Sequence, residues 1–372
     1  MGGWRTQLQA AEICTFSIGG DSYIRFGMDG QLLVGPQKAQ PLCVAGSKYL
    51  HLLKELKTFK KEKAYELFSD EETDCFYLIK KPKNIQLNEQ HEKVIQLLEE
   101  MPHSLFYLAE KLQKDAESLG LCVLVEMGVL QRIAVTPTDI LHVMGRYTYF
   151  DETIALTGVE ILANKAGKSV SAFTQMVYSR IIEELVFSFL QSIADFEKQG
   201  FVIKDNGAAM YYISKTLRKE QQSLLQTEFK VTKPVVAIGA PAQAWMIDVC
   251  EKLYTKAIIP EHAEVANAVG AAVGQVVETA EALIRPGREH KYFVLHAPWA
   301  YKEFDTLQDA LNYAIPSIKQ YISVKVRQAG SMEFEIVESH EDIYTEEESS
   351  NTKTYIETRI KASAFGSPVW IT

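Results

Sequence analysis

The chain has 372 residues, enough for two or three domains with a substantial buried core. Its composition, 47% hydrophobic and 23% charged, is typical of a globular protein, and its net charge of −9 argues against a general nucleic-acid or anionic-membrane surface. The five cysteines lie far apart without a CxxC pair, and no run of about 18 apolar residues predicts a membrane span. The first residues lack the apolar core of a signal peptide, so we expect a soluble, cytoplasmic protein.

A hairpin is predicted near the start of the chain, within a β-rich region over residues 10–50. Residues 23–26 and 31–34 are short β-prone runs, and the Met-Asp-Gly sequence at residues 28–30 between them is a turn signal. We therefore expect the two runs to pair as antiparallel strands.

A glycine turn precedes this hairpin and holds four candidate ligand-contacting residues: Gly19, Gly20, Asp21 and Ser22. Glycines let a backbone approach a ligand closely, and the Asp21 carboxylate could hold a metal-bound water or a substrate N–H. The alternative is a β-turn in which Asp21 bonds its own backbone.

Residues 51–135 have a different, helical character. Three short helices are predicted over residues 89–100, 104–113 and 115–127, with Ser104 as an N-cap, and a strand follows over residues 129–135. Three helices with a hairpin resemble a winged helix, a shape often used on DNA. Over residues 80–135, eight acidic residues slightly outnumber seven basic ones, and no basic stripe follows the third helix, so we interpret the segment as an inserted structural module.

A capping-box pattern opens the next helix. Thr136 can cap, Pro137 suits the first turn, and Asp139 stands where a capping-box acid would. His142 follows Asp139 by three residues, which places both side chains on one helical face. An Asp–His pair could transfer protons or ligate a metal, whereas the structural alternatives are a capping acid and a satisfied core histidine.

Two patterns follow in the middle of the chain. Residues 169–200 carry apolar side chains at steps of three and four, which predicts one or two long helices whose stripe packs in the core. Residues 234–275 predict a strand, a glycine turn, a helix, a second strand and a helix of small residues. We expect the first strand to be buried on both faces and the small residues of the last helix to permit close packing.

The turn of this βαβ pattern is a second candidate site. In open α/β sheets, ligands bind at the carboxyl ends of strands, where backbone N–H groups face the crevice. Gly239, Ala240 and Pro241 stand at such a place. The alternative is a plain βαβ crossover that binds no ligand.

The last part of the chain, residues 286–372, predicts a small βαββ module with no evident chemistry.

Four motifs taken together resemble the carboxyl-terminal part of the large subunit of the hydantoinase/5-oxoprolinase family, in the actin-like ATPase superfamily. They are TFSIGGDSYI with LLVGP after it, TPTDILHVMGR, VVAIGAPAQAW and IIPEHAEVANAVGAAVG, and they occur in the family's order over roughly residues 2–280. The resemblance implies an α/β fold: a partial actin-like ATPase (ribonuclease H-like) lobe over residues 1–50 and 136–285, with a winged-helix-like insert over residues 51–135 and an α+β module over residues 286–372.

The resemblance also implies a function. Hydrolytic family members use ATP to activate an amide carbonyl so that water can open a cyclic amide, and related members carboxylate ketones. ATP and a divalent metal, Mg²⁺ or Mn²⁺, are the implied cofactors. The implied site residues are Asp21, Asp139 and His142 for catalysis, and Gly19, Gly20, Ser22, Gly239, Ala240, Pro241 and Asn267 for the cofactor.

The chain departs from the family in one respect. Family members carry a DxGGTxTD phosphate loop and a second such loop, and the printed sequence contains neither. We therefore expect the chain to work with another chain that supplies the missing half of the ATPase or a second hydantoinase subunit, through an exposed apolar interface. The alternative function is that of a non-catalytic, partner-binding fragment.

Overall fold

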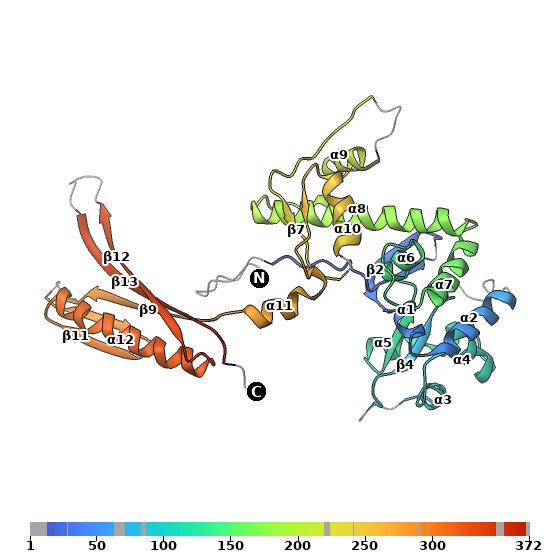
Figure 1. The fold of residues 1–372 in the computed structure, drawn as a ribbon, viewed down its shortest axis with the longest axis horizontal. Helices are drawn as coiled ribbons and strands as arrows, with labels where there is room; N and C mark the ends of the chain where they lie inside the picture. The colour runs from blue at the N-terminus through green and yellow to red at the C-terminus, as the bar shows by residue number, and fades with distance from the viewer. Residues whose placement is uncertain are drawn as a thin grey trace. The chain divides into compact units, whose positions relative to one another are not determined.

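The computed structural model describes residues 13–27, 29–62, 71–82, 87–218, 224–240, 242–288, 291–346 and 353–369. The structure is a mixed α/β protein (Figure 1). Its chain divides into two compact units, Met1–Glu264 and Val265–Thr372. Each unit has its own hydrophobic core.

The first unit begins with the predicted hairpin. Strand β1 (Ser22–Phe26) pairs antiparallel with β2 (Leu32–Lys38), which confirms the predicted hairpin. Met28, the first residue of the turn signal, lies outside the described residues. The backbone N–H of Ile24 donates to the carbonyl of Val135 at 3.1 Å, so the hairpin is joined to a segment far along the chain.

A four-stranded sheet with helices follows. Its elements are β3 (Gln40–Pro41), α1 (Leu42–Gly46), α2 (Leu50–Glu62), β4 (Cys75–Leu78), α3 (Glu89–Leu97), β5 (His103–Ser104), α4 (Leu105–Leu112), α5 (Leu121–Glu126) and β6 (Leu130–Ala134). The strand order is β3-β6-β4-β5. The first two predicted helices are present as α3 and α4, and Ser104 caps α4 by accepting the N–H of Tyr107 at 3.2 Å. The third, predicted over residues 115–127, is broken at Gly120, whose φ is +62°, into a 3-10 turn (Glu117–Leu119) and the short helix α5.

Residues 51–135 do not form the separate winged-helix-like insert that the sequence predicts. Strand β6 pairs antiparallel with β4, which precedes the three helices, and parallel with β3, which lies outside the proposed insert. The buried residues of this segment also belong to the same core cluster as those of the flanking helices. The segment therefore shares its sheet and its core with the rest of the first unit.

Four further helices complete the larger part of this unit: α6 (Pro137–Val143), α7 (Glu152–Lys165), α8 (Val170–Phe196) and α9 (Gly207–Arg218). Helix α8 is the predicted long helix, capped by Ser169, whose hydroxyl accepts the N–H of Ala172 at 3.2 Å. Its stripe is buried at Phe173, Val177 and Ile181, so the predicted core role is confirmed for the first half of the helix. It is wrong for the last residue of the stripe, because Phe196 is 66% exposed.

The βαβ pattern is also confirmed. Strand β7 (Val235–Val236) runs parallel to β8 (Ala257–Ile258), and α10 (Ala242–Lys252) connects them. The expectation of a strand buried on both faces is wrong, because Val236 and Ile238 are 61% and 56% exposed. This sheet has two strands, and α10 buries its apolar side towards α8 instead of covering both faces of β7.

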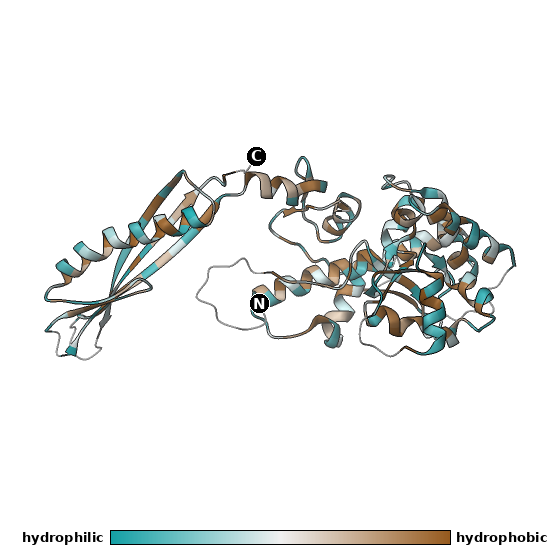
Figure 2. Cartoon of the chain, turned by 90° about the horizontal axis from the view of Figure 1, so that it is seen from below, coloured by the Kyte–Doolittle hydropathy of each residue, from teal (hydrophilic) through white to brown (hydrophobic). Residues whose placement is uncertain are grey.

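The second unit contains one antiparallel sheet and one long helix after α11 (Ala266–Val273). The elements are β9 (Val276–Pro286), β10 (Phe293–Ala297), β11 (Ala300–Phe304), α12 (Leu307–Gln328), β12 (Phe334–Glu346) and β13 (Lys353–Gly366). The strand order is β11-β10-β9-β13-β12. Figure 2 shows hydrophobic and hydrophilic residues alternating along α12, whose buried residues face the sheet core.

The predicted βαββ module is therefore larger than expected. Strand β9 pairs with both β10 and β13, so residues 276–285 belong to this sheet and not to the preceding lobe. Alternation in β9 places Ala280, Ala282 and Ile284 in the core with a two-residue period, while Glu281 and Arg285 are exposed. Among the described helices, none is both long and apolar enough to cross a membrane.

Gly46 on α1 and Gly158 on α7 allow the two helices to approach closely, which leads to a stability prediction. A Cβ on Gly158 would overlap Leu42 Cδ1 and lie 2.9 Å from Val135 Cγ2. We expect Gly158→Ala to lower the free energy of unfolding by about 1–3 kcal/mol, because overpacking outweighs the roughly 1 kcal/mol gained in helix propensity. Urea unfolding of the first unit measures this change.

Gly207→Ala is the matched control. Gly207 begins α9, and a Cβ there would meet no atom within 4 Å. We expect this variant to be neutral or slightly stabilised. Equal loss of stability in both variants would show that crowding between α1 and α7 is not the cause.

Candidate functional site

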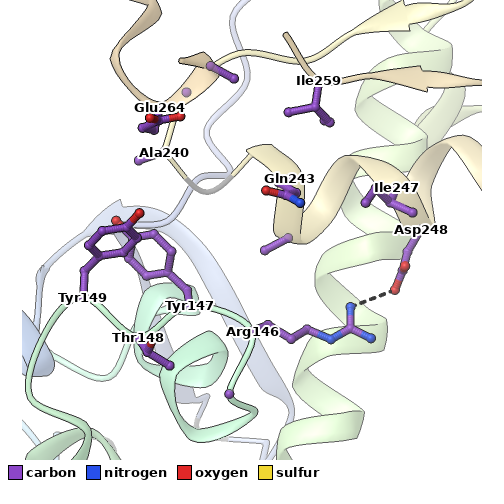
Figure 3. A pocket seen from close by; sticks show the side chains of 14 residues that line it. Arg146, Tyr147, Thr148, Tyr149, Ala240, Gln243, Ile247, Asp248, Ile259 and Glu264 are labelled. Atoms are coloured by element: carbon purple, nitrogen blue, oxygen red, sulfur yellow. Dashed lines mark hydrogen bonds and ion pairs between the residues drawn. The ribbon is translucent and has the colours of Figure 1, made fainter. Parts of the chain in front are cut away.

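A pocket of about 460 Å³ opens in the first unit beside the loop that follows β7 (Figure 3). Three of the sequence motifs contribute its walls: the end of TPTDILHVMGR, the loop and first turns of VVAIGAPAQAW, and the segment after β8. The lining residues are Gly145, Arg146, Tyr147, Thr148, Tyr149, Gly239, Ala240, Gln243, Ala244, Ile247, Asp248, Ile259, Ala263 and Glu264. Residues separated by about a hundred positions thus meet at one place.

The single arginine among these lining residues is neutralised by its neighbours. Arg146 donates to Asp248 at 3.1 Å and to the hydroxyl of Tyr178 at 2.5 Å. Burial, and then the hydrogen bond to Asp248, raises the pKa of Tyr178 above its ordinary value, so this phenol stays protonated. Since Glu264 adds a further acid, the lining carries no excess positive charge for a phosphate group.

Two tyrosines form an aromatic wall of the pocket. The ring centroids of Tyr147 and Tyr149 lie 4.8 Å apart with a tilt of 46°. Tyr149 is 75% exposed, and Figure 3 shows its ring beside that of Tyr147, facing the loop that carries Ala240. An exposed ring at a pocket wall can stack on a flat ligand.

The predicted glycine turn lines this pocket, but its backbone groups are occupied. Gly239 has a φ of +110°, which favours glycine. Its N–H donates to the carbonyl of Ala263 at 2.7 Å, and its carbonyl accepts the N–H of Ala242 at 3.0 Å. Gly239 therefore shapes the wall and does not offer this N–H to an anion. Ala240 also lines the pocket, and Pro241 lies outside the described residues.

A second, smaller pocket of about 200 Å³ lies at the same loop. Gly19 and Gly20 line it together with Pro137, Ile238 and Ala242, and most of its other lining side chains are apolar. The loop between β7 and α10 thus contributes to both pockets. The carbonyl of Gly20 accepts two hydrogen bonds from Thr138, from its N–H at 3.1 Å and its hydroxyl at 2.7 Å.

The other two residues of the glycine turn have structural partners. Ser22 is buried, and its hydroxyl accepts the N–H of Gly19 at 2.9 Å, so it closes the turn. Asp21 is exposed and pairs with Lys38 at 2.7 Å. The serine, and not Asp21, makes the turn-closing bond that the structural alternative assigned to the aspartate.

Asp139 is a buried structural acid. Its carboxylate accepts the N–H of Cys43 at 2.7 Å and of Leu42 at 3.2 Å, together with the N–H and hydroxyl of Thr136 at 2.8 and 2.9 Å. The predicted capping box is confirmed. Burial raises the pKa of Asp139, and the hydrogen bonds from Cys43 and Thr136 oppose that shift. With four donors on two oxygens, this carboxylate has no free position for a substrate.

His142 is a satisfied core histidine. Its Nδ1 lies 2.8 Å from the carbonyl of Thr138, and its Nε2 accepts the N–H of Phe150 at 3.1 Å. A carbonyl only accepts and an amide N–H only donates, so Nδ1 carries the hydrogen and the ring is neutral. Asp139 and His142 therefore do not form the predicted catalytic pair, because each is hydrogen-bonded to structural partners of its own.

The remaining predicted cofactor residue, Asn267, lies on α11 in the second unit with its side chain exposed. Close packing of this helix is not seen among the described residues of the second unit, where no residue of α11 is buried. A Cβ on Gly270 would meet no atom within 4 Å. Small side chains allow another helix or strand to pack closely against a helix, but they do not ensure that such an element is present.

Several pocket residues were not predicted, namely Arg146, Tyr147, Tyr149 and Asp248. Arg146 ends a recognised motif and the two tyrosines follow it directly, so the continuation of that motif was the available signal. Nothing in the sequence marked Asp248 as a pocket residue, because its pairing with Arg146 spans 102 residues.

In comparisons with known proteins, no family model, curated protein or solved structure matches this chain.

The hydrogen bonds of Asp139 lead to a second stability prediction. We expect Asp139→Asn to lower the free energy of unfolding by about 2–3 kcal/mol, because the amide NH₂ would face backbone donors and leave a buried N–H unpaired. The matched control, Asp21→Asn, removes an exposed ion pair and should change stability by less than about 1 kcal/mol. Chemical denaturation of both variants measures the difference; similar values would contradict the assigned role of Asp139.

Proposed function

We propose that the first unit is the nucleoside-binding lobe of an ATP-dependent amidohydrolase of the hydantoinase/5-oxoprolinase type, which opens a cyclic amide after ATP activates the carbonyl. The observation that carries this proposal is the meeting of three family-like motifs at one pocket. In the actin-like ATPase superfamily that these motifs resemble, the loop at Gly239 and Ala240 belongs to the adenosine side of the nucleotide site.

The chemistry of the pocket supports the nucleoside end of ATP over its phosphate end. Arg146 is already paired with Asp248, and Glu264 would repel a phosphate group. The exposed Tyr149 ring offers a stacking surface for adenine, and Gln243 and Glu264 offer acceptors for ribose hydroxyl groups.

We assign the smaller, apolar pocket at Gly19 and Gly20 to the ring of the cyclic amide. It shares the β7–α10 loop with the larger pocket, so a substrate there would lie close to the bound nucleotide. Asp21, exposed at the end of the same turn, is the residue we assign to a metal-bound water. Mg²⁺ or Mn²⁺ would enter with the ATP phosphates.

A partner chain would supply the phosphate loops. Val236 and Ile258 expose apolar side chains on the two-stranded sheet, and Ile238 exposes one in the loop after β7, which lines both pockets. Exposed apolar surface of this kind supports association with another protein. The five free cysteines fit a reducing compartment, so we place the assembly in the cytoplasm.

The second candidate function is partner binding without turnover. The exposed apolar surface favours it independently of the pockets. A complex reconstituted with a chain that carries DxGGTxTD loops separates the two functions. Hydrolysis of ATP that depends on a cyclic amide supports the enzyme, and complex formation without ATP hydrolysis supports the binding role.

The nucleoside assignment gives a direct prediction. We expect Tyr149→Ala to weaken binding of ATP and of adenosine about tenfold, since loss of base stacking costs about 1–3 kcal/mol. Titration calorimetry with adenosine, ATP and tripolyphosphate measures this effect. Tripolyphosphate should not compete, because the pocket lacks unpaired positive charge.

Tyr301→Ala is the control for that experiment. Tyr301 is about as exposed as Tyr149 but lies on β11 of the second unit. Its removal should leave binding unchanged. Absence of adenosine binding to the wild-type chain, or tighter binding of tripolyphosphate than of adenosine, would contradict the assignment.

A further inference from the structure

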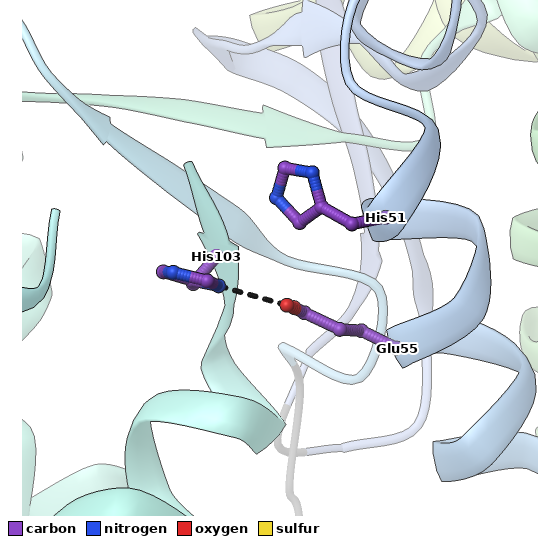
Figure 4. Close-up of side chains that lie close together, drawn as sticks. All are labelled: His51, Glu55 and His103. Atoms are coloured by element: carbon purple, nitrogen blue, oxygen red, sulfur yellow. Dashed lines mark hydrogen bonds and ion pairs between the residues drawn. The ribbon is translucent and has the colours of Figure 1, made fainter. Parts of the chain in front are cut away.

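A second group of polar side chains lies in the first unit, apart from both pockets. His51 and Glu55 extend from α2, and His103 extends from β5 (Figure 4). One ligand atom from each of the three residues lies within 4.8 Å of the other two. Two imidazoles and a carboxylate in this arrangement are a donor set used for divalent transition metals.

Local structure explains why the three groups meet. His51 and Glu55 are four residues apart on α2, so they lie on the same helical face one turn from each other. Strand β5 contacts α2, which brings His103 to that face. The side chains of Glu55 and His103 are only 13% and 11% exposed, so both groups are largely withdrawn from water.

Neighbouring groups hold each donor in place. The N–H of Ser104 donates to Glu55 Oε2 at 2.7 Å, which leaves Oε1 directed at His103 Nδ1, 2.8 Å away. The ring of Tyr107 stacks on that of His103 with centroids 4.1 Å apart. Such supporting contacts are typical of metal ligands, whose orientation is fixed by a second layer of partners.

One ring nitrogen of His51 and one of His103 carry hydrogens that a bound cation would replace. His51 Nε2 lies 2.6 Å from the carbonyl oxygen of Pro102, which can only accept, so this nitrogen carries a hydrogen without a cation. His103 Nδ1 likewise donates to the Glu55 carboxylate, 2.8 Å away. A cation would replace the hydrogen that His103 Nδ1 shares with Glu55 and, if it bound His51 Nε2, the hydrogen that this nitrogen donates to the Pro102 carbonyl. The Glu55 charge would offset part of the charge of the cation.

We propose that His51, Glu55 and His103 bind one divalent transition cation of the zinc class, with water completing the coordination. Imidazole nitrogens favour Zn²⁺ and its neighbours over Mg²⁺ and Ca²⁺, which prefer oxygen-rich sites. The bound cation joins α2 to β5 and so fastens two segments separated by about fifty residues. This site is distinct from the Mg²⁺ or Mn²⁺ that accompanies ATP.

The test uses the full, untagged chain, freed of metal with a chelator and then titrated with ZnCl₂ or CoCl₂. We expect one equivalent of Zn²⁺ to bind, a rise in the unfolding temperature of the first unit, and visible absorption bands from bound Co²⁺. Millimolar Mg²⁺ should reproduce none of these effects. No stoichiometric Zn²⁺ and no Co²⁺ bands in the wild-type chain would overturn the proposal without recourse to any variant.

Variants then locate the site. Glu55→Gln keeps an acceptor for the Ser104 N–H but removes the charge, and we expect it and His51→Ala each to weaken Zn²⁺ binding at least tenfold. His91→Ala is the matched control, because its ring lies outside the group and its backbone N–H, not its side chain, is held by Asn88. Unchanged Zn²⁺ affinity in Glu55→Gln, or equal weakening in His91→Ala, would place the metal elsewhere and overturn the assignment.

The metal site is also separable from the proposed nucleoside site. Zn²⁺ binding is measured without nucleotide, and Tyr149→Ala should leave it unchanged. Loss of Zn²⁺ binding in Tyr149→Ala would contradict the separation of the two sites.

Discussion

The buried carboxylate of Asp139 is the interaction on which the first unit depends. It completes the first turn of α6 through Thr136 and also accepts the first backbone N–H groups of α1, 97 residues earlier in the sequence. A buried carboxylate is stable only when hydrogen bonds replace the water it has lost. One side chain therefore joins two helix starts, and the structure between them must close around it.

This junction also positions the pockets. Thr138, next to Asp139, donates twice to the carbonyl of Gly20 and so holds the glycine turn against α6. At the other end of α6, the chain continues through Gly145 into Arg146, which reaches Asp248 on α10. A motif first considered for catalysis thus serves mainly to orient the loops whose surfaces form the two pockets.

Local signals in the sequence predicted local structure well. The capping box at Thr136, the cap at Ser104 and the apolar stripe of α8 were all recognisable, because neighbouring residues determine them. The chemical roles of single residues could not be predicted in the same way. His142 could be interpreted as a catalytic base or as a core residue, and only its partners at Thr138 and Phe150 distinguish the two.

Burial and sheet membership depended on the whole fold. The apolar run at Val235 predicted a strand but not its exposure, which follows from the number of strands beside it. Strand β9 alternates correctly, yet its place beside β13 depends on residues about eighty positions later. Periodicity specifies which faces of an element are apolar and gives no information about which element will cover them.

The mixed α/β character, the helix starts and the βαβ unit with its glycine turn could be predicted from the sequence, because each arises from interactions within a few residues. The meeting of Gly239 with Arg146 and Tyr149 around one pocket, and of His103 with His51 and Glu55, could be recognised in the folded chain alone. The difference lies in the range of the interactions. Backbone preference and periodicity act over one or two turns, whereas a site requires side chains from distant segments to be fixed by a shared core.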